Sequence, residues 1–183
     1  MVFEWIAIGV VVVILLAFAF YYNRFVVLSN RIDNSLSQID VQLRKRADLV
    51  PNLISTVKGY AKHESKIMKD VTEARKALLS AKDIKGRMRA GSELQNALKS
   101  IFAIAENYPQ LKANENFLHL QKELAAIEDK VAYSRQYYND SILVYNNSVQ
   151  MFPGAMFAKI YRKKQKEYLQ IPSEAKAVPK VEF

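Results

Sequence analysis

Hydrophobic residues follow two different patterns along the chain. From Trp5 to Tyr22 no residue is charged, and a helix over this run would be about 27 Å long at about 1.5 Å per residue. That length is close to the bilayer's hydrocarbon core of about 30 Å, so the run predicts a membrane-spanning helix. Beyond residue 22, apolar residues recur every three or four positions, which is typical of amphipathic helices with one buried face.

The second pattern predicts four further helices. They cover residues 23–60, 63–83, 91–108 and 112–150. No stretch in this region alternates between apolar and polar residues as a half-buried strand would. Short connections favour antiparallel neighbours. The predicted fold class is therefore all-α, with a single N-terminal transmembrane helix that continues into an antiparallel four-helix bundle, followed by a short C-terminal tail.

The helix breaks rest on a few residues. Gly59 and the segment after it separate the first two helices. Pro51 lies inside the first helix, where it removes one backbone hydrogen bond and is expected to kink the helix or end a turn. Ser92 is expected to cap the third helix and Asn114 the fourth. Phe152-Pro153-Gly154 is expected to stop the fourth.

These patterns predict three parts of the chain: a transmembrane anchor over 1–22, a cytoplasmic bundle over 23–150 and a basic-aromatic tail over 151–183. The tail contains three of the five prolines and is expected to be loosely docked or disordered.

The flanks of the apolar run predict its orientation. Trp5 lies at one end and Tyr21 and Tyr22 at the other, as in an aromatic belt, and Arg24 follows directly. Basic residues stay on the cytoplasmic side of bacterial membranes. The N-terminus is therefore expected outside and the bundle in the cytosol. A cleaved signal peptide is the alternative, since Ala17-Phe18-Ala19 resembles a cleavage site, but no Lys or Arg precedes the run.

Composition removes many enzyme classes. The chain has no Cys, so it contains no disulfide, zinc finger or thiolate nucleophile. The two histidines, His63 and His119, belong to no HExxH motif, and the ExxH motifs of carboxylate-bridged metal bundles are absent. We therefore expect no catalytic residues, no metal and no cofactor.

Three consecutive basic residues, Arg44, Lys45 and Arg46, point in three directions around a helix. Arg44 or Arg46 is therefore a candidate for bonding a carboxylate on a neighbouring helix or a second subunit. The simpler interpretation is that Asp40 pairs with Arg44, and Gln42 with Arg46, along one helix surface.

The formal net charge is +9. Part of it lies in the tail, where basic residues alternate with aromatic ones and could contact an anionic leaflet. The candidates for lipid contact are Arg162, Lys163, Lys164 and Lys166. A solvated charge run is the competing interpretation. Tyr133, Tyr137 and Arg135 could stack on single-stranded nucleic acid, but a membrane anchor argues against it, so no nucleic-acid partner is expected.

Several segments resemble the LemA family. They are Tyr22-Asn23-Arg24-Phe25, the run QIDVQLRKRADLVPNLISTVKGYAKHE (38–64), VTEAR (71–75) and FPG (152–154). The resemblance implies a bacterial membrane protein with one N-terminal span and a cytoplasmic helical bundle. It also implies no enzymatic activity, and one branch of the family suggests work on membrane organisation.

Two functions fit these features. The first is a membrane-anchored scaffold in the bacterial cytoplasmic membrane, whose partners are the lipid bilayer and further copies of itself. The second is an adaptor or regulator of another membrane protein, such as a membrane protease or signalling enzyme.

Overall fold

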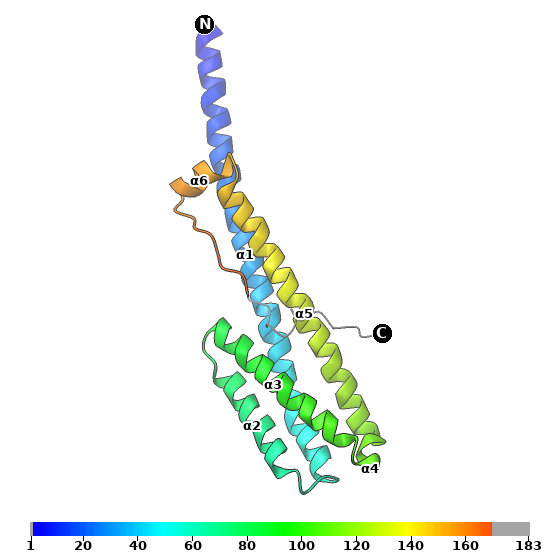
Figure 1. The fold of residues 1–183 in the computed structure, drawn as a ribbon. Helices are drawn as coiled ribbons and strands as arrows, with labels where there is room; N and C mark the ends of the chain where they lie inside the picture. The colour runs from blue at the N-terminus through cyan, green and yellow to red at the C-terminus, as the bar shows by residue number, and fades with distance from the viewer. Residues whose placement is uncertain (1, 170–183) are drawn as a thin grey trace, which may run out of the picture. The chain divides into compact units, whose positions relative to one another are not determined.

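The computed structural model describes residues 2–169, and among these every regular element is a helix (Figure 1). The helices are α1 (Val2–Lys58), α2 (Ser65–Ser80), α3 (Ile84–Ala105), α4 (Pro109–Lys112), α5 (Glu115–Gln150) and α6 (Gly154–Ile160). The predicted all-α class is confirmed. The predicted break after Gly59 is also present, because α1 ends at Lys58.

The chain divides into two compact units, described separately here. The terminal unit comprises Met1–Leu36 and Arg135–Phe183, of which 2–36 and 135–169 are described. The central unit is Ser37–Ser134. Helices α1 and α5 each contribute one part to each unit.

Within the terminal unit, α1 begins with an apolar segment that contacts little else. Side chains such as Phe3, Val13 and Leu16 are more than three-fifths exposed. In the described residues, α1 is the one helix long and apolar enough to cross a membrane, and its most apolar stretch is not buried at all. Exposed apolar surface of this extent is costly in water, since each buried CH₂ gains about 0.8 kcal/mol.

The central unit is built around aliphatic side chains at the spacing that the sequence predicts. Helices α2 and α3 pack side by side (Figure 1). The fully or almost fully buried residues include Ile39, Leu43, Val50, Leu53, Val71, Leu94, Ile101, Leu111, Phe117 and Val131. The apolar residues that recur every three or four positions therefore largely form the core of this unit, as predicted.

Pro51 does not end α1, so the predicted end of a turn at this position is wrong. The helix continues to Lys58, and Pro51 is exposed. Proline lacks the N–H that would donate to the carbonyl of Ala47, four residues earlier. Arg75 of α2 supplies the missing donor, because its Nε donates to the Ala47 carbonyl oxygen at 2.8 Å. A side chain from a neighbouring helix thus satisfies the acceptor that the proline leaves free.

One predicted cap is wrong and one is confirmed. Helix α3 begins at Ile84, not near 91, because the Asp83 side chain accepts from the Gly86 N–H and caps it. Ser92 lies inside the helix and donates to the Met88 carbonyl. Asn114 is a cap: its Oδ1 accepts from the Phe117 N–H at 3.0 Å.

Candidate functional site: an aromatic collar and a C-terminal clasp

Aromatic rings gather in the terminal unit where the uncharged part of α1 ends. Tyr21 stacks on Phe157 of α6, with ring centroids 4.5 Å apart and planes 8° apart. Phe18 meets Phe157 edge-on at 5.0 Å. We call this cluster the aromatic collar: Phe18, Tyr21, Tyr22, Phe25, Phe157 and Tyr161. Such pairs add about 0.5–1.5 kcal/mol each beyond the area they bury.

One hydrogen bond ties the collar together. The Tyr161 hydroxyl donates to the backbone carbonyl of Phe18 at 3.0 Å. This bond fixes residues just after α6 to a turn of α1 more than a hundred positions earlier in the chain. Phe25, completely buried, closes the cluster against Tyr145 of α5.

The turn between α5 and α6 brings the chain back to α1. Helix α5 ends at Gln150, and the Phe152–Pro153 peptide bond is cis. Gly154 then starts α6 so close to Ser148 that a Cβ would overlap the Ser148 carbonyl oxygen. Only glycine fits this approach, and the same Cβ would lie in ordinary contact with the Tyr21 ring at 3.4 Å.

The segment after α6 is held along α5 by two asparagines. Asn146, 4% exposed, donates from Nδ2 to the Lys166 carbonyl and accepts the Lys166 N–H at Oδ1, both at 2.9 Å. Asn139 makes the same pair of bonds to Leu169, at 3.1 and 2.9 Å. We call these four bonds the C-terminal clasp. Within residues 151–169 the tail is therefore docked, which corrects the expectation of a loose segment; residues 170–183 lie outside the described chain.

The clasp also includes Lys166, one of the residues predicted to contact lipid. Lys166 Nζ donates to Ser29 Oγ at 3.2 Å and lies 5.4 Å from the centre of the Tyr145 ring. Its ammonium thus faces the protein. Arg162 and Lys164 are exposed, and Lys163 is half-buried. Arg162 has a positive φ of 54°, at the point where the chain leaves α6.

The predicted anchor residues take different positions. Trp5 is 73% exposed, Tyr21 is half-buried in the collar, and Tyr22 meets Tyr161 edge-on at 5.6 Å. Arg24 donates from Nε to Ser148 Oγ at 3.2 Å. Three of these four residues therefore contact the α5–α6 region.

Two tyrosines of α5 are protonated over a wider pH range than usual. Burial raises the pKa of Tyr138, and the nearby Asp33 carboxylate raises it further. Burial alone raises the pKa of Tyr145. Both phenols pack in the terminal unit and stay neutral at physiological pH.

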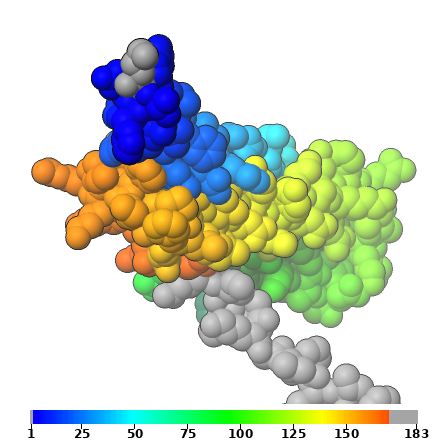
Figure 2. All heavy atoms as spheres, turned by 90° about the horizontal axis from the view of Figure 1, so that it is seen from above, coloured from blue at the N-terminus to red at the C-terminus, as the bar shows by residue number. Residues whose placement is uncertain are grey.

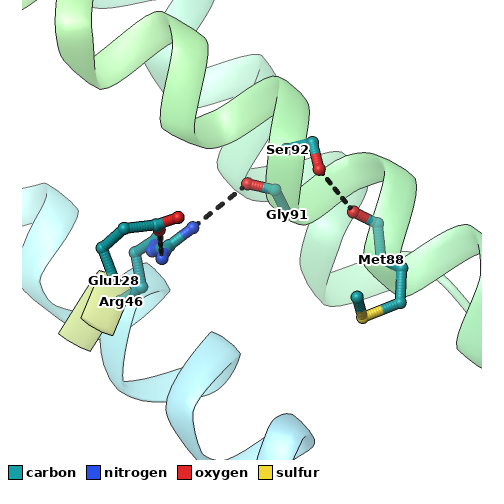
Figure 3. Close-up of polar contacts among 5 residues, drawn as sticks. All are labelled: Arg46, Met88, Gly91, Ser92 and Glu128. Atoms are coloured by element: carbon teal, nitrogen blue, oxygen red, sulfur yellow. Dashed lines mark hydrogen bonds and ion pairs between the residues drawn. The ribbon is translucent and has the colours of Figure 1, made fainter. Parts of the chain in front are cut away.

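The central unit contains a buried cation. Arg46 is 1% exposed; one nitrogen pairs with the Glu128 carboxylate of α5, and Nη1 donates to the Gly91 carbonyl of α3 at 3.3 Å (Figure 3). Burial lowers the pKa of Arg46, and Glu128 opposes that shift. The guanidinium still carries its charge at neutral pH, because arginine is not deprotonated in proteins. Arg44, two residues earlier, is exposed.

Gly91 makes the approach to Arg46 possible. A Cβ at Gly91 would lie 2.8 Å from Leu43 Cδ2, so α3 comes closer to α1 here than an alanine would allow without adjustment. Leu43 and Arg46 are neighbours on one face of α1. The buried ion pair and this close helix contact therefore belong to one packing arrangement.

The described residues contain no group of three or more His, Cys, Asp or Glu side chains placed to hold a metal ion. His119 is exposed and lies 3.9 Å from the exposed Glu123. Of the buried polar residues, Arg46, Asn146 and Ser148 join helices to each other or to the tail, whereas the hydroxyls of Ser35 and Ser141 donate to carbonyls of their own helices.

The two asparagines that form the clasp are not among the predicted site residues. Asn139 and Asn146 are seven residues apart and so share one face of α5, beside Tyr138, Ile142 and Tyr145. A polar amide on an apolar helix face requires a partner when buried. That rule could have identified the positions, although not the backbone groups they bind.

A family model named the LemA family matches residues 35–183. The chain belongs to the LemA family. The match covers the C-terminal half of α1 and every later helix, including the FPG turn and α6. It begins after the uncharged segment of α1.

Individual relatives of this LemA-family chain are more distant. It is 25% identical over 175 residues to the magnetosome protein MamQ 2 of Paramagnetospirillum magneticum, covering 81% of this chain and 64% of that one. The magnetosome protein MamQ of Magnetospirillum gryphiswaldense is 25% identical over 173 residues, covering 80% and 64%. Protein LemA of Metamycoplasma hominis is 23% identical over 124 residues, covering 67% and 57%. The chain thus spans less than two thirds of the length of these relatives.

Proposed function

We propose that this chain is a non-enzymatic, single-pass protein of the bacterial cytoplasmic membrane, whose helical body acts as a scaffold by self-association. The observation that carries the proposal is the division of α1. Its first part exposes an uncharged apolar face on all sides, while its last part supplies the core of the central unit. One helix thus joins a lipid-compatible segment to a folded domain.

The body has features suited to a scaffold. Four helical segments of the central unit are joined by direct contacts: Arg46 of α1 binds α3 and α5, Arg75 of α2 binds α1, and α2 packs on α3. These contacts support the arrangement as an antiparallel four-helix bundle. Two of the relatives are named magnetosome proteins, and a role in organising a membrane is consistent with that name.

The orientation is part of the proposal. The N-terminal side of the apolar segment carries Glu4, whereas Arg24 and Arg31 follow it. Positive residues remain on the cytoplasmic side, so the central unit and the part of the terminal unit beyond the apolar segment would lie in the cytosol.

Photo-crosslinking in cells tests self-association. A photoreactive phenylalanine is placed singly at Leu79, Leu118 and Tyr133, which are exposed apolar residues of the central unit. We expect adducts of twice the monomer mass at one or more of these positions. The same group at the exposed polar residue Asn107 measures random collision. A dominant adduct with one other membrane protein would favour the adaptor, and monomer alone at every position would refute self-association.

A further inference from the structure

Helix α6 has one face against α1 and another that is mostly exposed. Phe157 and Tyr161 point into the aromatic collar, and Gly154 and Ala158 are buried beside them. On the other side Met156 is 59% exposed and Ile160 is 56% exposed. Just before the helix, Met151 is 63% and Phe152 is 82% exposed. Four large apolar side chains between residues 151 and 160 are therefore exposed.

These side chains sit at the level of α1 where its uncharged segment ends. The rings that α6 and Tyr161 contact, Phe18, Tyr21 and Tyr22, lie at the end of the uncharged run, shortly before Arg24. Figure 1 shows α6 lying across this part of α1 rather than along it, and Figure 2 shows the end of α5 and α6 forming a projection beside the N-terminal helix. If α1 spans the bilayer, α6 lies at the boundary between headgroups and acyl chains.

The charges around α6 suit an anionic surface. Basic residues follow or interrupt its exposed face: Lys159, Arg162, Lys163 and Lys164. Long basic side chains beside apolar ones can reach headgroup phosphates while their stems stay near the acyl region. Between residues 151 and 166 no acidic residue opposes them.

We propose that Met151, Phe152, Met156 and Ile160 form a foot that inserts into the inner leaflet of the membrane, with the adjacent basic residues on anionic phospholipid headgroups. This rests on the proposed membrane anchoring of α1. The combination of an apolar face, basic flanks and a position in the interface plane is that of an interfacial amphipathic helix. Anchor and foot together fix the terminal unit to the bilayer at two points. The foot also explains an otherwise unfavourable feature, namely that Phe152 is the most exposed aromatic ring near the collar.

Tryptophan quenching tests the foot in the full-length protein. Trp5 is the single tryptophan, so a Trp5→Phe background allows a reporter to be placed anywhere. The reporter Phe152→Trp replaces one exposed aromatic ring by another. The matched control is Leu143→Trp, an exposed apolar residue of α5 in the same unit, about 10 Å from the end of that helix at about 1.5 Å per residue. All proteins are reconstituted into phosphatidylglycerol–phosphatidylcholine vesicles with or without bromine on the upper acyl chains.

We expect bromine to cause a large loss of emission, with a shift to shorter wavelength, for the Phe152→Trp reporter and little change for the Leu143→Trp control. Quenching of the reporter should decrease in pure phosphatidylcholine, because the basic residues lose their partners. An unquenched reporter would overturn the foot. A blue-shifted but unquenched reporter would also overturn it, since that ring would be covered by protein, such as a second copy.

Native Trp5 separates this test from that of the anchor. Trp5 in the unmodified chain reports insertion of α1 itself. Quenching of Trp5 without quenching of the Phe152→Trp reporter would reject the foot and keep the anchor. No quenching of Trp5 in the same vesicles would reject the proposed membrane anchoring, on which the foot depends. Circular dichroism of each variant shows whether its helix content matches that of the unmodified chain; a difference confined to the Phe152→Trp variant would assign that ring to the fold and count against the foot.

Discussion

The terminal and central units are stabilised in different ways, although both are helical. The central unit buries aliphatic side chains that recur at helical spacing, with one buried ion pair. The terminal unit buries aromatic rings and polar groups, among them Ser35, Ser141, Asn146 and Ser148. Its fold depends on an extended segment after α6 that has no secondary structure of its own.

This difference separates two kinds of stability. Periodic aliphatic packing is spread over many buried residues, so the central unit should tolerate most single substitutions at its exposed positions. The terminal unit relies on a few specific groups: one glycine, two asparagines and one tyrosine hydroxyl. Loss of one of these groups should release the tail while leaving the central unit folded. A region that can detach locally is also a natural point of control.

The largest expected effect is on the buried ion pair. Glu128→Ala leaves the Arg46 guanidinium buried with one carbonyl partner, and breaking such a pair costs about 3 kcal/mol or more. Chemical denaturation of the full chain in detergent measures it. The control is Glu123→Ala on the same helix, whose pairing with His119 is exposed and worth at most about 1 kcal/mol. Equal losses in the two variants would show that the buried pair is not important.

The next largest effect is at Gly154. Gly154→Ala forces a methyl group onto the Ser148 carbonyl, and overpacking of this kind costs about 1–3 kcal/mol. We expect α6 to detach and trypsin to cleave faster at Arg162, Lys163 and Lys164. Gly59→Ala, where the nearest atom is at 3.4 Å, should leave the cleavage rate unchanged. Slow cleavage in both variants would contradict the close approach.

The Pro51–Arg75 arrangement is tested by a pair of substitutions. Arg75→Met removes the donor to the Ala47 carbonyl and should cost about 1–2 kcal/mol in unfolding free energy, as for a part-buried unsatisfied acceptor. In a Pro51→Ala background the alanine N–H can donate instead, so the same substitution should cost less. Additive effects of the two substitutions would refute the compensation.

Substitution of an asparagine in the clasp should have a smaller effect on the unfolding free energy. Asn146→Ala removes both bonds to the Lys166 backbone, but water can replace part of them, so we expect a loss of about 1 kcal/mol. The tail should again be cleaved faster by trypsin. The adjacent and exposed Asn147→Ala is the control and should behave like the unmodified chain.

The smallest expected effect is on the stability of the fold at alkaline pH. Tyr138 and Tyr145 have pKa values raised above 10.0 in the folded chain, so the folded state holds their protons more tightly than the unfolded state. Their contribution to stability is therefore complete below pH 10 and lost as pH rises through the folded pKa. Phenolate absorbance should show late titration that decreases in the Tyr138→Phe, Tyr145→Phe double variant. An unchanged titration curve would place these phenols in solvent.

Helix type and core positions could be predicted because they depend on local periodicity. Val71, Leu94 and Val131 belong to the apolar residues that recur at helical spacing, and all three are fully or almost fully buried. Asn114 was identified as a cap because its signal is a single residue before an apolar run. The cap at Asp83 was not predicted, and Ser92 was expected in its place. The two glycines after Asp83 suggested a loop where the chain is already helical.

The site could be predicted less well, because it is made of contacts between distant segments. Tyr161 binds a backbone carbonyl of α1, and Asn146 binds the backbone of Lys166. Backbone acceptors carry no side-chain pattern, so the sequence shows one half of each interaction at most. Arg75 illustrates the same limit, since its partner is a carbonyl freed by a proline far along the chain.

The central claim is that the uncharged part of α1 spans the membrane and the folded chain beyond it lies in the cytosol. Since the chain has no cysteine, single-cysteine variants can be labelled without background. A membrane-impermeant maleimide applied to intact spheroplasts should label Val2→Cys but not Ser80→Cys, and should label both after lysis. Labelling of Ser80→Cys in intact spheroplasts, or its recovery in the soluble fraction, would contradict the account.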